Sequence, residues 1–226
     1  MTTPEARASR VIATALAMNE AGINHGMSGN VSIRSDSGML ITPSSVEYSL
    51  LIESDIVFME ADGSWENAGG RRPSSEWRFH LDLYAARPDV NAIVHCHPTA
   101  ATGVAAHGRG IGPFHYMVGI AGGHDIRCAP YATFGTPELS ANVVEAMVDR
   151  KACLMANHGI IAVGPELKQA LNIAVEVEVL AAQYLAALAI GEPPELSDEQ
   201  MQEVLDKMNS GPGYGSSAVA SQLEGN

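Results

Sequence analysis

One stretch of sequence decides how this chain folds: Val90-Asn91-Ala92-Ile93-Val94-His95-Cys96-His97-Pro98. Its apolar first half predicts a buried strand. Because side chains two positions apart on a strand point to the same face, we expect His95 and His97 to project together. Cys96 then points to the opposite face, where we expect a small buried hydrophobic residue. Two neighbouring imidazoles alone would also suit two ordinary positions on a half-buried strand.

A third histidine stands in a similar setting. Asn157-His158-Gly159 separates the apolar runs 152–156 and 160–163, which predicts two strands joined by a turn. Three imidazoles with an open position are the ligand set of a catalytic zinc, whereas a structural zinc is usually closed by protein ligands. Glu76 is a candidate for the remaining position or for a base beside the metal. The spacing does not establish that His158 meets the other two histidines.

The composition bounds the class of protein. A chain of 226 residues with 46% hydrophobic content suits one α/β domain, and an aromatic fraction of 5% implies a core of aliphatic side chains. The formal net charge is −13 and no long basic run occurs, so we expect neither nucleic acid nor an anionic membrane surface as a partner. An anionic substrate then has to be held by local donors.

The cysteines and the first residues bear on the compartment. Cys96, Cys128 and Cys153 are odd in number and lack Cys-x-x-Cys spacing, so we expect free thiols and a cytoplasmic location rather than a disulfide framework. The first residues lack the basic and apolar regions of a secretory signal. No uninterrupted apolar run reaches the ~20 residues of a membrane span, so none is expected.

Hydrophobic periodicity and turn residues predict one domain over residues 1–210, with mixed strands and flanking helices, and a flexible tail over 211–226. The predicted helices cover 4–21, 76–86, 136–150, 165–190 and 197–208. The predicted strands cover 31–34, 39–42, 55–59 and 90–97, with two more flanking His158. Thr2 and Glu5 have the spacing of a capping box, and Thr136 is the expected N-cap of its helix.

Three polar segments rich in hydrogen-bond donors lie before the histidine pair: Ser28-Gly29-Asn30, Thr42-Pro43-Ser44-Ser45 and Ser74-Ser75. A glycine lets a ligand approach the backbone, and an asparagine offers an amide donor. Ser74 and Ser75 lie at the expected start of a helix, where unpaired N–H groups favour an anion. Together with the histidines, these segments indicate a phosphate held by neutral donors. The alternative is that Ser75 is simply an N-cap.

With these residues in view, the chain resembles the class II aldolase/adducin family. The matching stretches are Ser28–Ser32, Met39–Pro43, Pro73–His80, His95–His97, His115–Met117, Cys128–Thr136 and Asn157–Gly159. The resemblance implies a three-layer α/β/α fold around a mostly antiparallel sheet, assembled as a homotetramer with sites at subunit interfaces. It implies a metal-dependent lyase that reversibly cleaves a ketose 1-phosphate of the L-fuculose 1-phosphate type into dihydroxyacetone phosphate and a short aldehyde.

The resemblance also assigns roles to residues. It implies one Zn²⁺ per subunit on His95, His97 and His158, and the same donors suit Mn²⁺, Fe²⁺ or Co²⁺. Glu76 would ligate the zinc at rest and become the acid/base when substrate displaces it. Tyr116 of a neighbouring subunit would donate a proton to the departing aldehyde oxygen.

A phosphate site follows from the same resemblance. It implies these phosphate-binding residues: Gly29, Asn30, Ser44, Ser45, Ser74 and Ser75. The family often has Thr-Gly at positions 44–45, and serine tolerates fewer backbone conformations than glycine. The tail is also longer than usual, with Tyr214 as the candidate for closing a neighbouring site.

Other readings are kept open. A Schiff-base aldolase would need a reactive lysine, and only Lys151, Lys168 and Lys207 exist. Within the resembled family, the substrate could be a 5-deoxyribulose or 5-methylthioribulose 1-phosphate, or the reaction a pentulose-phosphate epimerisation or dehydration. A non-catalytic, adducin-like assembly module is disfavoured by the complete histidine and glutamate set. His80, four residues after Glu76, suits either a partner behind a metal ligand or a packed core histidine.

Overall fold

The computed structural model describes residues 3–66 and 69–210. Within these residues, eight strands form one sheet in the order β4-β3-β2-β1-β5-β8-β7-β6. Neighbouring strands are antiparallel except for the pair β6 and β7. Thr2 and the predicted tail with Tyr214 lie outside the described residues. The strands are β1 (Asn30–Ser35), β2 (Gly38–Ile41), β3 (Val57–Glu60), β4 (Trp65–Glu66), β5 (Ala92–Cys96), β6 (Cys128–Ala129), β7 (Ala152–Met155) and β8 (Gly159–Gly164).

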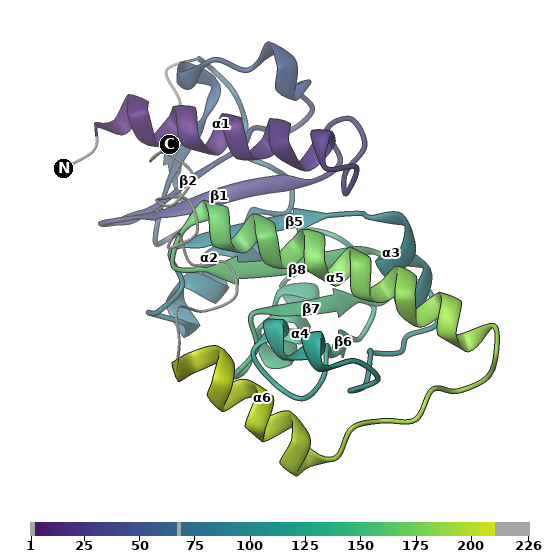
Figure 1. Cartoon of the computed structure of the whole chain (residues 1–226). Helices are drawn as coiled ribbons and strands as arrows, with labels where there is room; N and C mark the ends of the chain where they lie inside the picture. The colour runs from purple at the N-terminus through teal and green to yellow at the C-terminus, as the bar shows by residue number, and fades with distance from the viewer. Residues whose placement is uncertain (1–2, 67–68, 211–226) are drawn as a thin grey trace, which may run out of the picture.

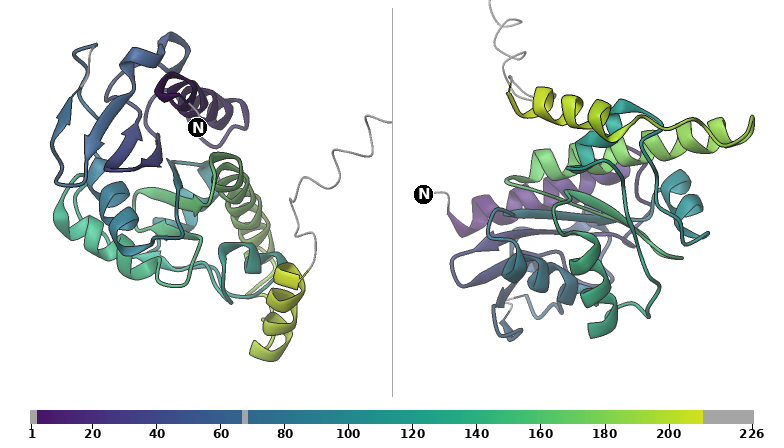
Figure 2. Two further views of the ribbon diagram at one scale, coloured as in Figure 1. Left: turned by 90° about the vertical axis from the view of Figure 1, so that its left-hand side faces the viewer. Right: turned by 90° about the horizontal axis from the view of Figure 1, so that it is seen from below.

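Helices cover both faces of this sheet (Figure 1). α1 (Pro4–Glu20), α3 (Thr99–Ala105) and α5 (Leu167–Leu188) share one hydrophobic core with the sheet. α2 (Trp77–Ala86) and α4 (Pro137–Ala146) share a second core on the other face. Figure 2 shows the three layers, with α1 and α5 on one side of the sheet and α2 and α4 on the other. The predicted α/β/α fold with a mostly antiparallel sheet is confirmed.

β5 is a central strand, and every one of its residues is buried. Asn30 of β1 lies opposite His95 on one side, and Ile161 of β8 lies opposite it on the other. Cys96 belongs to the core beneath α1, α3 and α5, whereas the ring of His95 meets Phe79 of α2 edge-on at a centroid distance of 5.3 Å. The two side chains therefore point to opposite faces, as the strand period predicts.

Three local predictions need correction. Thr3, not Thr2, is the N-cap of α1, and its hydroxyl accepts a hydrogen bond from Ala6 N at 3.2 Å. The strand expected from residue 55 begins at Val57, because residues 53–55 form a 3₁₀ turn. The helix expected to reach residue 150 ends at Ala146, ahead of a turn in which Asp149 has a φ of 55°. The N-cap predicted for that helix, Thr136, is confirmed.

Helix α3 was not predicted, because the group that caps it is remote in sequence. Its N-cap position is Pro98, whose side chain makes no capping hydrogen bond. The carboxylate of Glu178 on α5 instead accepts from Ala100 N and Ala101 N, each at 2.8 Å. These are two of the unpaired N–H groups that every helix start exposes. Glu178 therefore ties α5 to the chain immediately after the histidine pair.

α5 is also long and apolar enough to span a membrane by length and composition, with a mean hydropathy of 1.4 over its most apolar window. A core helix of a globular domain meets the same criterion. α5 packs across β5 and β8 and buries Leu167, Val177 and Leu180, among others. Its apolar face is therefore accounted for by the core.

Glu178→Ala is expected to lower the free energy of unfolding by about 1–3 kcal/mol, because two partly buried N–H groups of α3 lose their acceptor. The measurement is urea unfolding followed by circular dichroism. Glu176→Ala, on the same helix, is the matched control and should leave the midpoint nearly unchanged. Equal midpoints for the two variants would contradict the capping role.

Candidate active site

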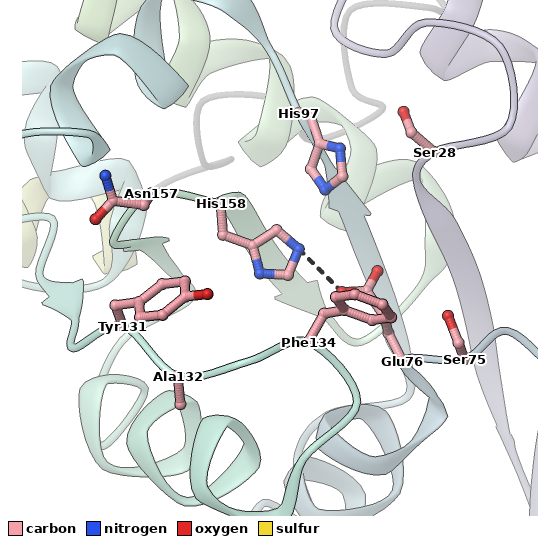
Figure 3. A pocket seen from close by; sticks show the side chains of 9 residues that line it. All are labelled: Ser28, Ser75, Glu76, His97, Tyr131, Ala132, Phe134, Asn157 and His158. Carbon is pink, nitrogen blue, oxygen red and sulfur yellow. Dashed lines mark ion pairs between the residues drawn. The ribbon is translucent and has the colours of Figure 1, made fainter.

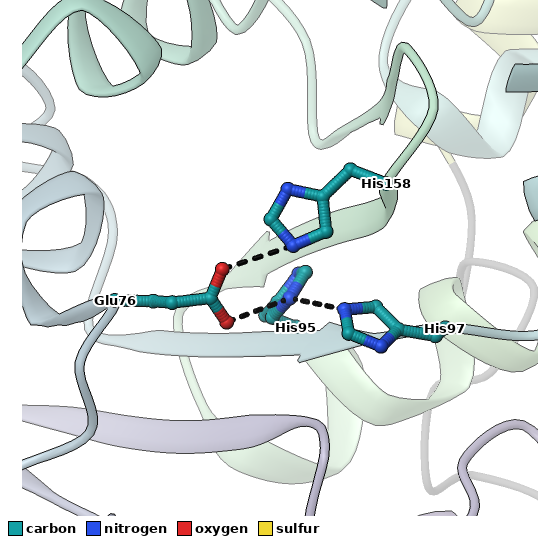
Figure 4. Close-up of side chains that lie close together, drawn as sticks. All are labelled: Glu76, His95, His97 and His158. Atoms are coloured by element: carbon teal, nitrogen blue, oxygen red, sulfur yellow. Dashed lines mark hydrogen bonds and ion pairs between the residues drawn. The ribbon is translucent and has the colours of Figure 1, made fainter. Parts of the chain in front are cut away.

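Four side chains from three places in the sequence converge on one point (Figure 4). Nε2 of His95 lies 2.9 Å from Nε2 of His97, and 3.2 Å from Oε2 of Glu76. The other carboxylate oxygen, Oε1, lies 2.9 Å from Nε2 of His158. Four such atoms, one from each residue, all lie within 4.8 Å of one another. The structure thus brings His158 to the other two histidines, which spacing alone left open.

The sheet explains this convergence. His95 lies near the end of β5 and His97 directly follows that strand, while His158 lies in the turn between β7 and β8. Because β8 pairs with β5, the turn falls beside the end of β5. Glu76 is the N-cap residue of α2, which places its side chain at the start of the helix.

The turn that carries His158 has a demanding backbone. His158 N donates to Met155 O at 3.1 Å, and Asn157 has a φ of 55°. Asparagine adopts this left-handed region more readily than most residues. A Cβ on Gly159 would lie 2.5 Å from both Cys96 O and Cδ2 of His97, so only glycine allows the turn to approach so closely. Geometry therefore favours asparagine at 157 and requires glycine at 159.

Burial and charge set the protonation of the cluster. Burial by itself raises the pKa of Glu76, but the close imidazoles of His95 and His158 outweigh this effect and hold the pKa well below its usual range. Burial, together with the neighbouring His95 and His158, lowers the pKa of His97 to about 3. Glu76 is therefore a carboxylate and His97 a neutral imidazole at neutral pH, which are the forms that bind metals.

The tautomer of His95 follows from its outer hydrogen bond. Its Nδ1 lies 2.7 Å from Ile160 O, and a carbonyl oxygen only accepts, so Nδ1 carries the proton. In the neutral ring, which is the form that binds metals, the lone pair of Nε2 then faces the cluster. This second hydrogen bond is the usual way in which proteins orient a metal-ligating histidine.

The donor set fits a divalent metal ion. Nε2 of His95 is a lone-pair donor, and Nε2 of His97 points at it from 2.9 Å. Oε1 of Glu76 is buried and lacks a hydrogen bond of acceptable geometry. Three imidazole nitrogens and one carboxylate oxygen match the first coordination sphere of zinc and related ions. A cation among them would satisfy these unpaired acceptors.

A cavity of about 430 Å³ opens beside the cluster (Figure 3). His97, His158 and Glu76 form its polar floor, and Tyr131 and Phe134 stand at its edge with exposed fractions of 61% and 62%. The residues that line it are Ser28, Ser75, Glu76, His97, Tyr131, Ala132, Phe134, Asn157 and His158. The cavity is large enough for a small ligand.

Sequence reasoning did not single out Tyr131, Phe134 or Asn157 as members of the site, and it named Ser28 only as part of the segment 28–30. The first three belong to stretches that carried the family resemblance, which was the available signal. No periodicity marks them, because they lie in loops and turns whose positions only the fold defines.

The predicted phosphate segments meet beside this cavity. Ser44 N donates to Arg72 O and Ser74 N donates to Thr42 O, each at 3.0 Å, so residues 42–45 lie along residues 72–75. Ser75 lines the cavity, and Ser74 Oγ accepts from Glu76 N at 3.3 Å rather than standing free. The expectation that Ser75 could be the N-cap is wrong, since Glu76 occupies that position.

Two positions in these segments have unusual backbone requirements. Ser45 has a φ of 60°, so serine here adopts a conformation that glycine takes more easily. A Cβ on Gly29 would lie 2.5 Å from His95 O, so this glycine is required for packing against β5. Asn30 is buried, and its side chain donates to Oε2 of Glu76 at 3.0 Å.

Tyr116 does not line the cavity described above. It opens the 3₁₀ helix η3 (Tyr116–Ala121) and is 43% exposed. Helix α6 (Asp198–Ser210) packs on η3, with Val204, Leu205 and Met208 close to Gly119.

Comparison with known proteins decides the family. Residues 9–185 match the model of the Class II Aldolase and Adducin N-terminal domain. The chain belongs to this family. The match spans the whole sheet and every residue of the cluster.

Relatives in this family are similar over most of their length. The 5-methylthioribulose-1-phosphate/5-deoxyribulose-1-phosphate aldolase of Rhodospirillum rubrum is 52% identical over 197 residues, covering 87% of this chain and 87% of the relative. The L-fuculose phosphate aldolase of Escherichia coli K12 is 50% identical over 204 residues, covering 90% and 94%. A solved structure titled L-fuculose 1-phosphate aldolase superposes with a TM-score of 0.87 at 40% identity, covering 92% of this chain and 97% of that one.

Asn157 provides a test of the turn. Asn157→Gly should retain the turn and the metal content, because glycine takes positive φ freely, whereas Asn157→Val should lose about 1–2 kcal/mol of stability from the left-handed backbone. The valine variant should also bind less metal, because His158 is displaced. Thermal unfolding and metal analysis of purified protein measure both effects. Equal metal content in the two variants would argue against a turn that positions His158.

Proposed function

We propose that this class II aldolase reversibly cleaves a ketose 1-phosphate into dihydroxyacetone phosphate and a short aldehyde, with a divalent metal ion at Glu76, His95, His97 and His158. One observation carries the proposal, namely the convergence of these four side chains beside an open cavity. The family and the similarity to sugar-phosphate aldolases support it.

Zinc is the proposed ion, since its sites commonly combine three imidazoles with one further position. Mn²⁺, Fe²⁺ and Co²⁺ accept the same donors. When bound, the metal supplies Lewis-acid stabilisation of the negative charge that bond cleavage leaves on the dihydroxyacetone phosphate fragment.

Glu76 is the proposed acid/base. In the direction of synthesis, its carboxylate removes the proton from the carbon of dihydroxyacetone phosphate that forms the new bond, and in cleavage it returns that proton. Its low pKa keeps it a carboxylate before substrate arrives, and it borders the cavity. A ligand that displaces Glu76 from the cluster would leave its carboxylate beside the reacting carbon.

The phosphate is assigned to the paired segments around residues 42–45 and 72–75, together with the loop at 28–30. Ser75 already faces the cavity at the start of α2, where backbone N–H groups favour an anion. Ser44, Ser45 and Ser74 add neutral donors in an acidic protein. Gly29 and Asn30 are assigned to the same region, and the side chain of Asn30 donates to Glu76.

A homotetramer with sites at subunit interfaces is proposed as the assembly. Tyr116 is 43% exposed and does not line the cavity of its own chain, and we assign it to a neighbouring subunit's site as proton donor to the aldehyde oxygen. A cytoplasmic location is proposed as well, in keeping with three free cysteines.

The aldolases of Rhodospirillum rubrum and Escherichia coli K12, which are 52% and 50% identical to this chain, are named for different sugar phosphates. L-fuculose 1-phosphate and the 5-deoxy or 5-methylthio pentulose 1-phosphates are therefore both proposed substrates. They share the dihydroxyacetone phosphate half and differ in the aldehyde tail, which would meet Tyr131 and Phe134. Release of an aldehyde separates all of them from epimerisation and from dehydration.

The first test is release of dihydroxyacetone phosphate from each proposed sugar phosphate by zinc-loaded protein, with and without a chelator. We expect rapid release of dihydroxyacetone phosphate, which a chelator abolishes and added zinc restores, because the proposed reaction needs the metal ion that the histidines would hold. Full activity in verified metal-free protein would refute the metal mechanism. A borohydride-trapped lysine adduct would point instead to Schiff-base chemistry.

Tyr116→Phe tests the proposed proton donor. It should lower kcat by about 10²–10⁴-fold, as expected for loss of a general acid, with a much smaller change in KM. Tyr131→Phe is the comparison variant at the edge of the cavity. An unchanged kcat in Tyr116→Phe would remove this residue from the chemistry. Sedimentation analysis would separate a lowered kcat caused by loss of the proton donor from one caused by loss of the tetramer.

A further inference from the structure

A line of buried polar side chains runs from Glu76 away from the cavity. Oε2 of Glu76 accepts from Asn30 Nδ2 at 3.0 Å, and Asn30 Oδ1 lies 2.5 Å from Nε2 of His80. Nδ1 of His80 lies 2.8 Å from Ser32 Oγ, which in turn lies 2.8 Å from the hydroxyl of Tyr84. All five residues are buried, and His80 and Ser32 have no exposed surface.

Two periodicities produce this line. Asn30 and Ser32 are two apart on β1, so they point to the same face. Glu76, His80 and Tyr84 are four apart along α2 and its N-cap, so they lie on the same side of that helix. The polar face of the strand therefore meets the polar side of the helix within an otherwise apolar layer.

The direction of every hydrogen bond in the line is fixed. A carboxylate only accepts, so the Asn30 amide nitrogen faces Glu76 and the Asn30 oxygen faces His80. That oxygen also only accepts, so Nε2 of His80 carries the proton. Nδ1 is then an acceptor for the Ser32 hydroxyl, and Ser32 Oγ accepts from Tyr84. Each donor points toward Glu76.

The outer residues hold the required protonation states. Burial, with the nearby His95, lowers the pKa of His80 to about 3, so the ring is neutral and has one N–H. Burial raises the pKa of Tyr84, so its hydroxyl stays protonated and can donate a hydrogen bond to Ser32 Oγ. Arg34 anchors the far end, with its guanidinium 4.8 Å from the centre of the Tyr84 ring and a hydrogen bond to Tyr84 O at 2.7 Å.

This line of hydrogen bonds gives the two carboxylate oxygens of Glu76 different partners. Oε2 has a donor in Asn30, whereas Oε1 has no hydrogen bond of acceptable geometry and lies 2.9 Å from His158. An oxygen held by a fixed amide cannot turn toward the cavity without leaving that amide unpaired, which is costly in a buried site. Oε1 is then the oxygen available to the metal or to a proton.

We propose that His80 is a positioning residue for Glu76: its Nε2–H orients the Asn30 amide, and the amide fixes which carboxylate oxygen turns toward His158. This inference rests on the proposed function, which gives Glu76 its chemical role. His80 and Asn30 touch no reacting atom in the proposal, and they act only through the carboxylate.

A matched pair of variants tests the proposal. Glutamine places an amide nitrogen where histidine has Nε2, so His80→Gln retains the donor to Asn30. Asparagine reaches only as far as Nδ1, so His80→Asn retains a partner for Ser32 and loses the donor to Asn30. His80→Asn should lower kcat about 10–100-fold with little change in KM, the range seen for residues that orient ligands, and His80→Gln should recover most of kcat.

Packing alone would produce a different pattern. If His80 only fills space, kcat should follow thermal stability in both variants, and equal kcat values for His80→Gln and His80→Asn would overturn the proposal. If both variants fail to fold, Ser32→Ala decides, because it removes the hydroxyl that donates to Nδ1 while leaving the ring in place. A lower kcat with unchanged KM supports the proposal, and an unchanged kcat refutes it.

A second readout separates this proposal from the proposed reaction. Competition between each variant and a chromogenic zinc chelator measures metal affinity without turnover. We expect His80→Asn to release zinc more readily than His80→Gln by about 10-fold or more, because Glu76 is a proposed ligand. If wild-type protein cleaves no sugar phosphate, the proposed reaction is wrong, but the zinc competition still tests the positioning role of His80. Equal zinc affinities of His80→Asn and His80→Gln would overturn that role.

Discussion

The antiparallel pairing of β5 with β1 and β8 is the constraint on which the rest of the structure depends. It brings the end of one strand, the β7–β8 turn and the polar face of another strand to a single point. Gly29 and Gly159 permit the close approach on either side, since a Cβ at either position would collide with the backbone of β5. Without that approach, the three histidines would remain separate features of the sequence.

A buried charged cluster needs support from the surrounding layers, and the two sides of the sheet provide it differently. On the α2 side, the support is polar, a directed series of hydrogen bonds that ends in Arg34 and Tyr84. On the α5 side, it is aliphatic, with Cys96 packed among hydrophobic residues. Glu178 adds one polar tie on this second side, where it caps the helix that follows His97.

Hydrophobic periodicity predicted most helices and strands, because the period of each depends only on residues that are close together in the sequence. The strand with His95 and His97 and the opposite orientation of Cys96 followed from a period of two. What the pattern missed depends on distant partners. Helix α3 is capped from α5, and the hydrogen bond from the Asn30 amide to Glu76 depends on the pairing of β1 with β5. The loop residues Tyr131 and Phe134 carry no period at all.

The loop over residues 131–134 differs in kind from the rest of the site. A sheet, the start of a helix and a tight turn position the cluster. Tyr131 and Phe134 instead belong to one loop, are exposed and line the cavity. Gly135 ends that loop close to Ser75 O, so its far end is fixed. Substitutions at 131 and 134 would therefore leave the buried cluster undisturbed. If this loop contacts the aldehyde as proposed, the aldolase could change its aldehyde, in evolution or by engineering, without change to the buried cluster.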